Sequence, residues 1–222
     1  MAAQADDGVV IAPDVRGLFT FYDELAGRFA AAGVQAIAFD YFGRTAGAER
    51  RSDDFAFREH VARTTPEQIQ ADVAAAITEL RTRTKIRRTY VLGFCMGGRV
   101  AFNAAADQPG IAGVIGFYGV PQRRDAQDRA APIDRVGQMR VPVLGLFGGA
   151  DPVIPAAAIA DFDAALTRAG LAHELVTYPG APHSFFDRSF DEWREACDDA
   201  WRRVVGFIAT GEPRTEGLGA QG

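Results

Sequence analysis

Residues 88–99 read Arg-Thr-Tyr-Val-Leu-Gly-Phe-Cys-Met-Gly-Gly-Arg, and this stretch decides which fold the rest of the chain can adopt. Its β-branched and apolar start indicates a buried strand, after which a cysteine stands between Gly93 and Gly97. The pattern Gly-x-nucleophile-x-Gly is that of a nucleophile elbow, with cysteine where serine usually stands. Small neighbours are needed because the tight turn from strand to helix strains the backbone of the nucleophile. The stretch therefore predicts that Cys95 projects over the end of a sheet.

The predicted position of Cys95 also favours a reactive thiol. An elbow places the sulfur at the N-terminus of the following helix, where unpaired N–H groups and the helix dipole stabilise a thiolate. A lone cysteine is otherwise most often a small core residue. The glycines at 93, 97 and 98 favour the elbow, so Cys95 is the candidate nucleophile.

Composition excludes several classes of function. The chain has 222 residues, 48% of them hydrophobic, and a net charge of −5, which does not favour nucleic acid or an anionic membrane surface as a partner. The first residues lack a secretory signal and no apolar run could span a membrane, so a cytoplasmic protein is expected. Cys95 and Cys197 should then be free thiols. No motif for a metal or a nucleotide cofactor occurs, so no cofactor is predicted.

Short apolar runs alternate with amphipathic stretches, which predicts a mainly parallel sheet with helices on both faces. The expected fold is therefore a three-layer α/β domain over residues 1–210, followed by a disordered tail at 211–222. Two irregular stretches interrupt the pattern, 43–64 with a short helix around 55–63 and 119–140 with a helical turn. Strands are expected at 9–12, 36–39, 89–92, 111–118, 143–147 and 174–178, and helices at 21–32, 66–83, 96–107, 155–170 and 189–210.

Two of these helices carry start signals. Thr65 and Gln68 have the spacing of a capping box, with Pro66 at the first helical position. Ser189 is the expected N-cap of the last helix, with Glu192 at the matching position. Both helices should begin directly after these capping residues.

Three residue types able to form a catalytic triad follow successive predicted strands. Cys95, Asp151 and His183 occur in the chain order nucleophile, acid, histidine, which is the order of the α/β-hydrolase fold. Because the carboxyl ends of parallel strands meet at one edge of a sheet, these three side chains are expected to converge there. Taken singly, Asp151 could be a turn residue and His183 a loop residue, but their joint placement favours a triad.

Two other histidines compete for the role of the base. His173 stands before its strand, at the wrong end of the sheet, and is discarded. His60 lies in the irregular stretch and is kept as an alternative. Cys197 falls among apolar residues of the last predicted helix, so core packing is expected there.

With these residues identified, the chain resembles the dienelactone hydrolase family over residues 8–210. The resemblance implies an α/β-hydrolase fold, a triad of Cys95, Asp151 and His183, and the hydrolysis of a lactone or ester, as by carboxymethylenebutenolidase. It also implies that Asp14, where better-known members have glutamate, contacts the resting thiol and helps to activate it. The motifs that carry the resemblance are Gly-Phe-Cys-Met-Gly-Gly at 93–98, Gly-Phe-Tyr-Gly at 116–119, Gly-Ala-Asp at 149–151 and Gly-Ala-Pro-His-Ser-Phe at 180–185.

The chain departs from this family where the substrate would bind. Dienelactone enzymes hold the substrate carboxylate with arginines, one of them four residues after the histidine, where this chain has Asp187 beside Arg188. The N-terminal hairpin that full-length members place before the core is expected to be missing, and a second subunit, as in a homodimer, could then cover the exposed sheet edge. The residues considered for the substrate pocket are the aromatics Phe42, Tyr118, Phe185 and Phe186, the arginines Arg58 and Arg188, and also Arg50, Arg51 and Arg63.

The predicted reaction is cysteine-dependent hydrolysis of a small lactone or ester. Cys95 would attack the carbonyl carbon to give a thioester, while the backbone N–H groups of Met96 and Val15 stabilise the oxyanion. Two alternatives remain open. One is a flavodoxin-like cysteine protein of the amidotransferase or glyoxalase type, although such proteins commonly have a histidine directly after the cysteine. The other is a noncatalytic hydrolase-fold protein that binds a small carbonyl compound.

Overall fold

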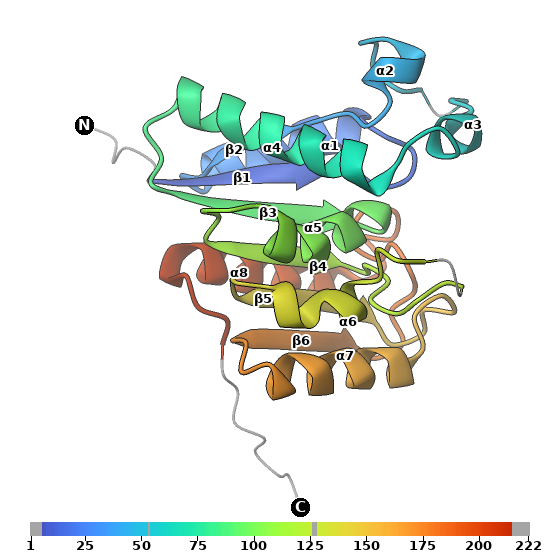
Figure 1. Cartoon of the computed structure of the whole chain (residues 1–222), viewed down its shortest axis with the longest axis vertical. Helices are drawn as coiled ribbons and strands as arrows, with labels where there is room; N and C mark the ends of the chain where they lie inside the picture. Colours follow the sequence, from blue (N-terminus) through green and yellow to red (C-terminus); the bar gives the residue numbers. More distant parts are fainter. Residues whose placement is uncertain (1–5, 53, 126–127, 215–222) are drawn as a thin grey trace, which may run out of the picture.

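A parallel β-sheet forms the centre of the structure, a computed structural model that describes residues 6–52, 54–125 and 128–214 (Figure 1). In these residues the sheet has the strand order β2-β1-β3-β4-β5-β6, and every neighbouring pair is parallel. The prediction of a mainly parallel α/β fold is therefore confirmed. The strands are β1 (Asp7–Ala12), β2 (Gln35–Ala38), β3 (Arg88–Phe94), β4 (Gly113–Phe117), β5 (Val143–Gly148) and β6 (His173–Tyr178).

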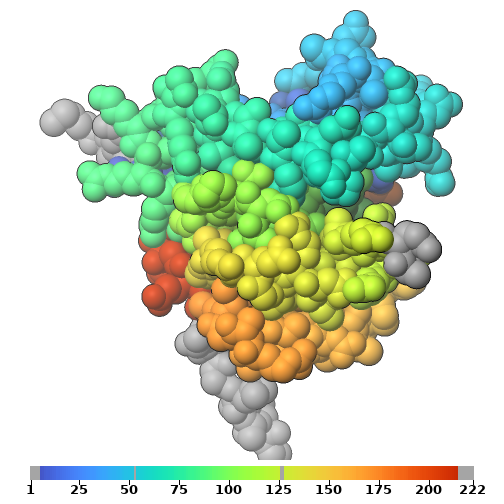
Figure 2. Space-filling view, viewed as in Figure 1, coloured from blue at the N-terminus to red at the C-terminus, as the bar shows by residue number. Residues whose placement is uncertain are grey.

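Helices cover both faces of the sheet and make three layers. Figures 1 and 2 show α4, α5, α6 and α7 over one face, while α1 and α8 lie behind the strands in Figure 1. On that second face the rings of Phe29 in α1 and Trp201 in α8 are 4.9 Å apart. The helices are α1 (Thr20–Ala31), α2 (Gly43–Ala46), α3 (Phe57–Val61), α4 (Pro66–Arg83), α5 (Met96–Asp107), α6 (Pro132–Arg135), α7 (Ala156–Arg168) and α8 (Arg194–Thr210), and a 3₁₀ turn (Val136–Gln138) follows α6.

Most predicted elements end within two residues of the observed ones, and α8 is the exception. It begins at Arg194 after Trp193, so the predicted N-cap role of Ser189 is wrong. Residues 184–193 instead form turns, in which the Phe190 ring packs at 5.8 Å from the ring of Phe186. The predicted capping box at Thr65 and Gln68 is confirmed in both directions.

The predicted tail at 211–222 and the predicted homodimer concern the end of the chain and the edges of the sheet. Gly211 ends α8 with a left-handed backbone, and residues 215–222 of the predicted tail lie outside the described residues.

The strands β2 and β6 form the two edges of the sheet in the described ranges. The homodimer, in which a second subunit would cover an exposed edge, stays a prediction. None of the described helices is both long enough and apolar enough to cross a membrane.

The predicted elbow is built by close backbone contacts around α5. A Cβ atom on Gly93 would lie 2.0 Å from the carbonyl oxygen of Gly97, and one on Gly97 would lie 2.0 Å from that of Ala12. Only glycine permits this approach, because backbone atoms cannot move aside as flexible side-chain ends can. The first turn of α5 is thereby held against the end of β1.

We expect Gly97→Ala to destabilise the protein by about 2–3 kcal/mol, the cost of inserting a methyl group into a closely packed site. Urea unfolding provides the measurement. Gly27→Ala is the matched control because it lies within α1 and its added Cβ would have nothing within 4 Å. That control should be neutral or stabilising by up to about 1 kcal/mol. Equal stability of the two variants would contradict the tight elbow.

Candidate active site

The three predicted triad residues meet at the carboxyl edge of the sheet. Cys95 links β3 to α5, Asp151 follows β5 and His183 follows β6. The Nδ1 atom of His183 is 2.6 Å from Oδ2 of Asp151, whose side chain is completely buried. The other carboxylate oxygen of Asp151 accepts the backbone N–H of Val153 at 2.8 Å, which fixes its orientation.

The His183 imidazole is held in its charged form. Burial alone would lower the pKa of this group, but hydrogen bonds to Asp151 and Cys95 outweigh that effect and raise the pKa of His183 to about 10. Because Cys95 is only partly buried, a small molecule can reach it from solvent. The second cysteine, Cys197, is fully buried in the core as predicted.

Backbone strain is concentrated at this edge. Among the described residues, three that are not glycine have positive φ angles: Cys95 at 53°, Tyr118 at 38° and Ser184 at 61°. Such conformations cost about 1–3 kcal/mol each and persist only where the surrounding structure enforces them. All three directly follow a strand end or His183, so the strain lies where the reactive groups are positioned.

The two predicted oxyanion donors lie on neighbouring segments. Gly97, which follows Met96, packs against the carbonyl oxygens of Ala12 and Pro13, directly before the loop that contains Val15. Within the described ranges, the backbone N–H groups of Met96 and Val15 have no hydrogen-bond acceptor. Both are therefore available to a substrate oxygen.

The Asp14 carboxylate does not contact the thiol as the resemblance implied. It accepts the backbone N–H and the Nε atom of Arg16, at 2.7 and 3.0 Å, and is also paired with Nη2 of the same residue. No hydrogen bond joins Asp14 to Cys95 in the described part of the chain. The reason is local, because a guanidinium two residues away binds both carboxylate oxygens.

Arg16 also reaches a second buried carboxylate, a link that sequence reasoning missed. Its Nη2 atom donates to Oδ2 of Asp187 at 2.8 Å, and the Tyr118 hydroxyl donates to Oδ1 at 2.8 Å. Burial raises the pKa of Asp187, against the opposing effects of Tyr118 and Arg16. The Tyr118 ring lies 5.0 Å from the His183 ring. An Asp-x-Arg sequence directly after the first strand is the only signal that pointed to this network.

The remaining pocket predictions are only partly matched. Phe42 and Phe185 have no exposed surface and belong to the core. Aromatic residues at strand ends occur both in cores and in pocket walls, so the residue type does not distinguish the two. Arg58 is exposed above the ring of Phe57. The Arg188 side chain is 56% exposed, with Nε 4.0 Å from Asp187.

Four residues weighed in the sequence analysis lie apart from the triad contacts. His60 bonds through Nδ1 to Thr45 Oγ1 at 2.8 Å. His173 pairs with Asp163 at the start of β6, the opposite end of the sheet from His183, as expected. Arg51 is buried against Asp40. Arg50 pairs with Asp23.

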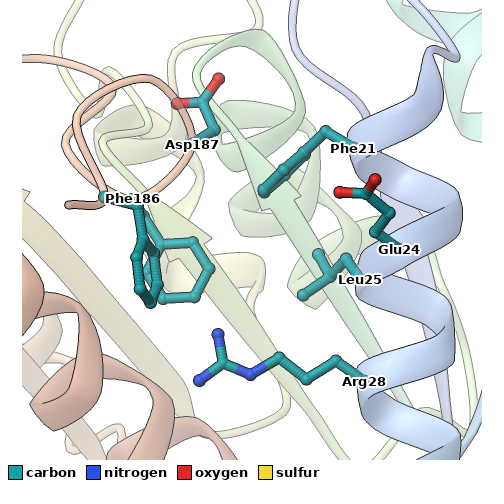
Figure 3. Close-up of a pocket in the computed structure, with 7 residues that line it drawn as sticks. Phe21, Glu24, Leu25, Arg28, Phe186 and Asp187 are labelled. Atoms are coloured by element: carbon teal, nitrogen blue, oxygen red, sulfur yellow. The ribbon is translucent and has the colours of Figure 1, made fainter.

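A cavity of about 270 Å³ lies beside this network. Figure 3 shows Glu24, Leu25 and Arg28 projecting from α1 toward Phe186 and Asp187. Asp187 thus borders both the cavity and the hydrogen bonds that lead to Tyr118. Among the described residues, no group of three or more His, Cys, Asp or Glu side chains could hold a metal ion.

Comparison with known proteins is consistent with this geometry. Residues 2–211 match the model of the dienelactone hydrolase family. A Bradyrhizobium protein provisionally named 2-oxo-3-(5-oxofuran-2-ylidene)propanoate lactonase is 29% identical over 209 residues, which cover 90% of this chain and 82% of that protein. The crystal structure of a Klebsiella pneumoniae protein, provisionally named a dienelactone hydrolase, has a TM-score of 0.83 at 27% identity and covers 95% of this chain and 89% of its own.

A third relative matches over a shorter range. A protein of Saccharolobus solfataricus provisionally named carboxymethylenebutenolidase is 37% identical over 145 residues, or 65% of this chain. That match spans about half, 52%, of the relative's length.

Proposed function

Because this chain belongs to the dienelactone hydrolase family, we propose that it hydrolyses a small lactone or carboxylic ester through Cys95, His183 and Asp151. One observation carries the proposal. The His183 imidazole is hydrogen-bonded to Asp151 at 2.6 Å, and the elbow cysteine Cys95 is close enough to contribute to the raised pKa of His183. Nucleophile, base and orienting carboxylate therefore stand in the order that covalent catalysis requires.

The first half of the proposed reaction forms a thioester. The Cys95 thiolate attacks the carbonyl carbon, and the resulting oxyanion accepts hydrogen bonds from the backbone N–H groups of Met96 and Val15. When the intermediate collapses, the carbon–oxygen bond breaks and the leaving oxygen takes the proton of the His183 imidazolium. With a lactone, that hydroxyl stays attached to the acyl chain.

The second half releases the acid. A water molecule gives its proton to His183 and attacks the thioester carbon, and the Cys95 thiolate departs. The His183 imidazolium and the thiolate are then restored for the next turnover. Throughout, the buried Asp151 carboxylate fixes the imidazole tautomer and stabilises its positive charge.

Membership of a hydrolase family favours this proposal over the two alternatives. The strand order alone does not separate it from a flavodoxin-like protein, since both share the arrangement 2-1-3-4-5. The residue after Cys95 is methionine rather than histidine, which also favours the hydrolase. A noncatalytic binder would lack turnover altogether.

Turnover and thiol labelling together test the proposed function. The protein should hydrolyse 4-nitrophenyl acetate and a simple lactone such as dihydrocoumarin, and iodoacetamide should abolish both activities in step with alkylation of Cys95. Peptide mapping identifies the labelled cysteine. Cys95 fully alkylated with activity retained, or no turnover of any ester or lactone, would contradict the proposal.

A further inference from the structure

Two buried carboxylates share one guanidinium beside the candidate active site. The side chains of Asp14 and Asp187 are only 5% and 3% exposed, and Arg16, which is 26% exposed, bonds to both. These residues, called here the Asp14–Arg16–Asp187 cluster, come from the loop after β1 and from the segment before α8. Two negative groups and one positive group leave a net charge of −1 in a poorly hydrated place.

The cluster borders the position that a substrate acyl group would occupy. Asp14 directly precedes Val15, whose N–H group is a proposed oxyanion donor. On the other side, Asp187 accepts a hydrogen bond from Tyr118, whose ring lies 5.0 Å from the His183 ring. One carboxylate is therefore carried by the residue next to Val15, and the other is linked to His183 through the side chain of Tyr118.

Other nearby charges do not cancel it, and the positive charge of His183 is paired with the Asp151 carboxylate. Arg28 and Glu24 line the cavity next to Asp187 and offset one another. Arg188 lies with Nε 4.0 Å from Asp187, and its side chain is more than half exposed, so water and salt screen it. The Arg16 guanidinium lies between the two carboxylates, and a substrate carboxylate would have to displace one of them to bind it.

We propose that this cluster makes the site select lactones and esters whose acyl part is uncharged, and that Asp187 is the residue that sets this selectivity. The inference rests on the proposed function and narrows its substrate class. A carboxylate on the acyl chain would meet the unbalanced negative charge at short range in a medium of low dielectric. An uncharged acyl chain meets no such repulsion.

The test compares two esters of similar size, one anionic and one neutral: mono-4-nitrophenyl adipate, whose carboxylate is too far along the chain to attack its own ester readily, and its methyl ester. At pH 8 the protein should hydrolyse the neutral diester with a kcat/KM at least about 10-fold above that of the anionic monoester. Asp187→Asn keeps the acceptor for Tyr118 but removes the charge, so it should raise the ratio of anionic to neutral kcat/KM by about 10-fold. Thermal unfolding of each variant reports whether the fold is kept.

Asp199→Asn is the matched control. Asp199 also accepts hydrogen bonds from a tyrosine and an arginine, Tyr178 at 3.0 Å and Arg203 at 2.6 Å, but it lies on α8, outside the triad contacts. This variant should leave the ratio unchanged. An equal change in Asp199→Asn, or an anionic ester hydrolysed as fast as the neutral one by the unaltered protein, would overturn the inference while leaving the hydrolase proposal intact.

A second measurement needs no turnover. Iodoacetate and iodoacetamide alkylate a thiol by the same displacement and differ in charge. Asp187→Asn should raise the rate ratio of iodoacetate to iodoacetamide at Cys95 several-fold, to about 10-fold. An unchanged ratio would overturn the inference. If no ester is hydrolysed, the proposed function fails, and the proposed selectivity fails with it even where this alkylation ratio shifts.

Discussion

Replacement of Cys95 by alanine should lower kcat/KM for 4-nitrophenyl acetate by about 10⁴-fold to 10⁶-fold, the loss typical of removing a covalent nucleophile. The physical reason is that the variant lacks the elbow thiol that would form the acyl intermediate. Stopped-flow or steady-state absorbance of released 4-nitrophenol measures the effect. Circular dichroism should show that the fold is kept, since Cys95 is only partly buried.

The second cysteine provides the control for that experiment. Cys197 is fully buried in α8, with its sulfur 3.5 Å from the carbonyl oxygen of Phe185, and burial raises its pKa to about 12. Such a thiol is neutral and inaccessible at ordinary pH. Cys197→Ala should therefore retain activity at some cost in stability. Retained turnover in Cys95→Ala would exclude covalent catalysis at this position.

Asp151→Asn should lower kcat by about 10³-fold to 10⁴-fold, because asparagine cannot hold the histidine tautomer or stabilise the imidazolium. The variant should also shift the pH profile. Burial lowers the pKa of His183, but Asp151 and Cys95 together raise it to about 10, so the imidazolium persists until the pH rises through that value. Without the carboxylate this pKa falls, and the alkaline decline in kcat/KM should begin at least about one pH unit lower.

Proton NMR of the His183 ring provides an independent check, because spontaneous ester hydrolysis limits assays at high pH. The matched control is Asp163→Asn, which removes the carboxylate partner of His173, 3.2 Å away at the far end of the sheet. It should change neither activity nor the His183 titration. An unmoved alkaline limb in Asp151→Asn would contradict the assigned role of this carboxylate.

The elbow and the three candidate catalytic residues could be predicted because each depends on short-range rules. Glycines at 93 and 97 allow the backbone contacts that form the turn, and parallel strands bring their carboxyl ends to one edge. Once β3, β5 and β6 were recognised, Cys95, Asp151 and His183 were expected together at the carboxyl edge of the sheet, because each follows one of these strands. The capping box at Thr65 is local in the same sense.

The features that could not be predicted depend on contacts between distant parts of the chain. Arg16 and Asp187 are 171 positions apart, and neither residue alone signals the other. Asp14 was assigned to the thiol because the position fits, but the guanidinium of Arg16 takes both of its oxygens. The late start of α8 has a similar origin. The turns that pack the Phe190 ring against Phe186 override the capping signal at Ser189.

The pocket residues illustrate a different difficulty. An aromatic residue after a strand can face a cavity or fill the core, and the residue type does not distinguish the two. Phe42 and Phe185 fill the core, whereas Phe186 borders the cavity with Phe21. Only the packing of α1 against the segment before α8 separates these cases (Figure 3).

Direct trapping of the acyl intermediate tests the central claim most sharply. After rapid acid quenching during turnover of 4-nitrophenyl acetate, mass spectrometry of the digested protein should find one acetyl group on the peptide that contains Cys95. Neutral hydroxylamine should remove that group, as it does from a thioester. An acetyl group found on another residue, or steady turnover with no acylated Cys95 under any quench, would contradict the account.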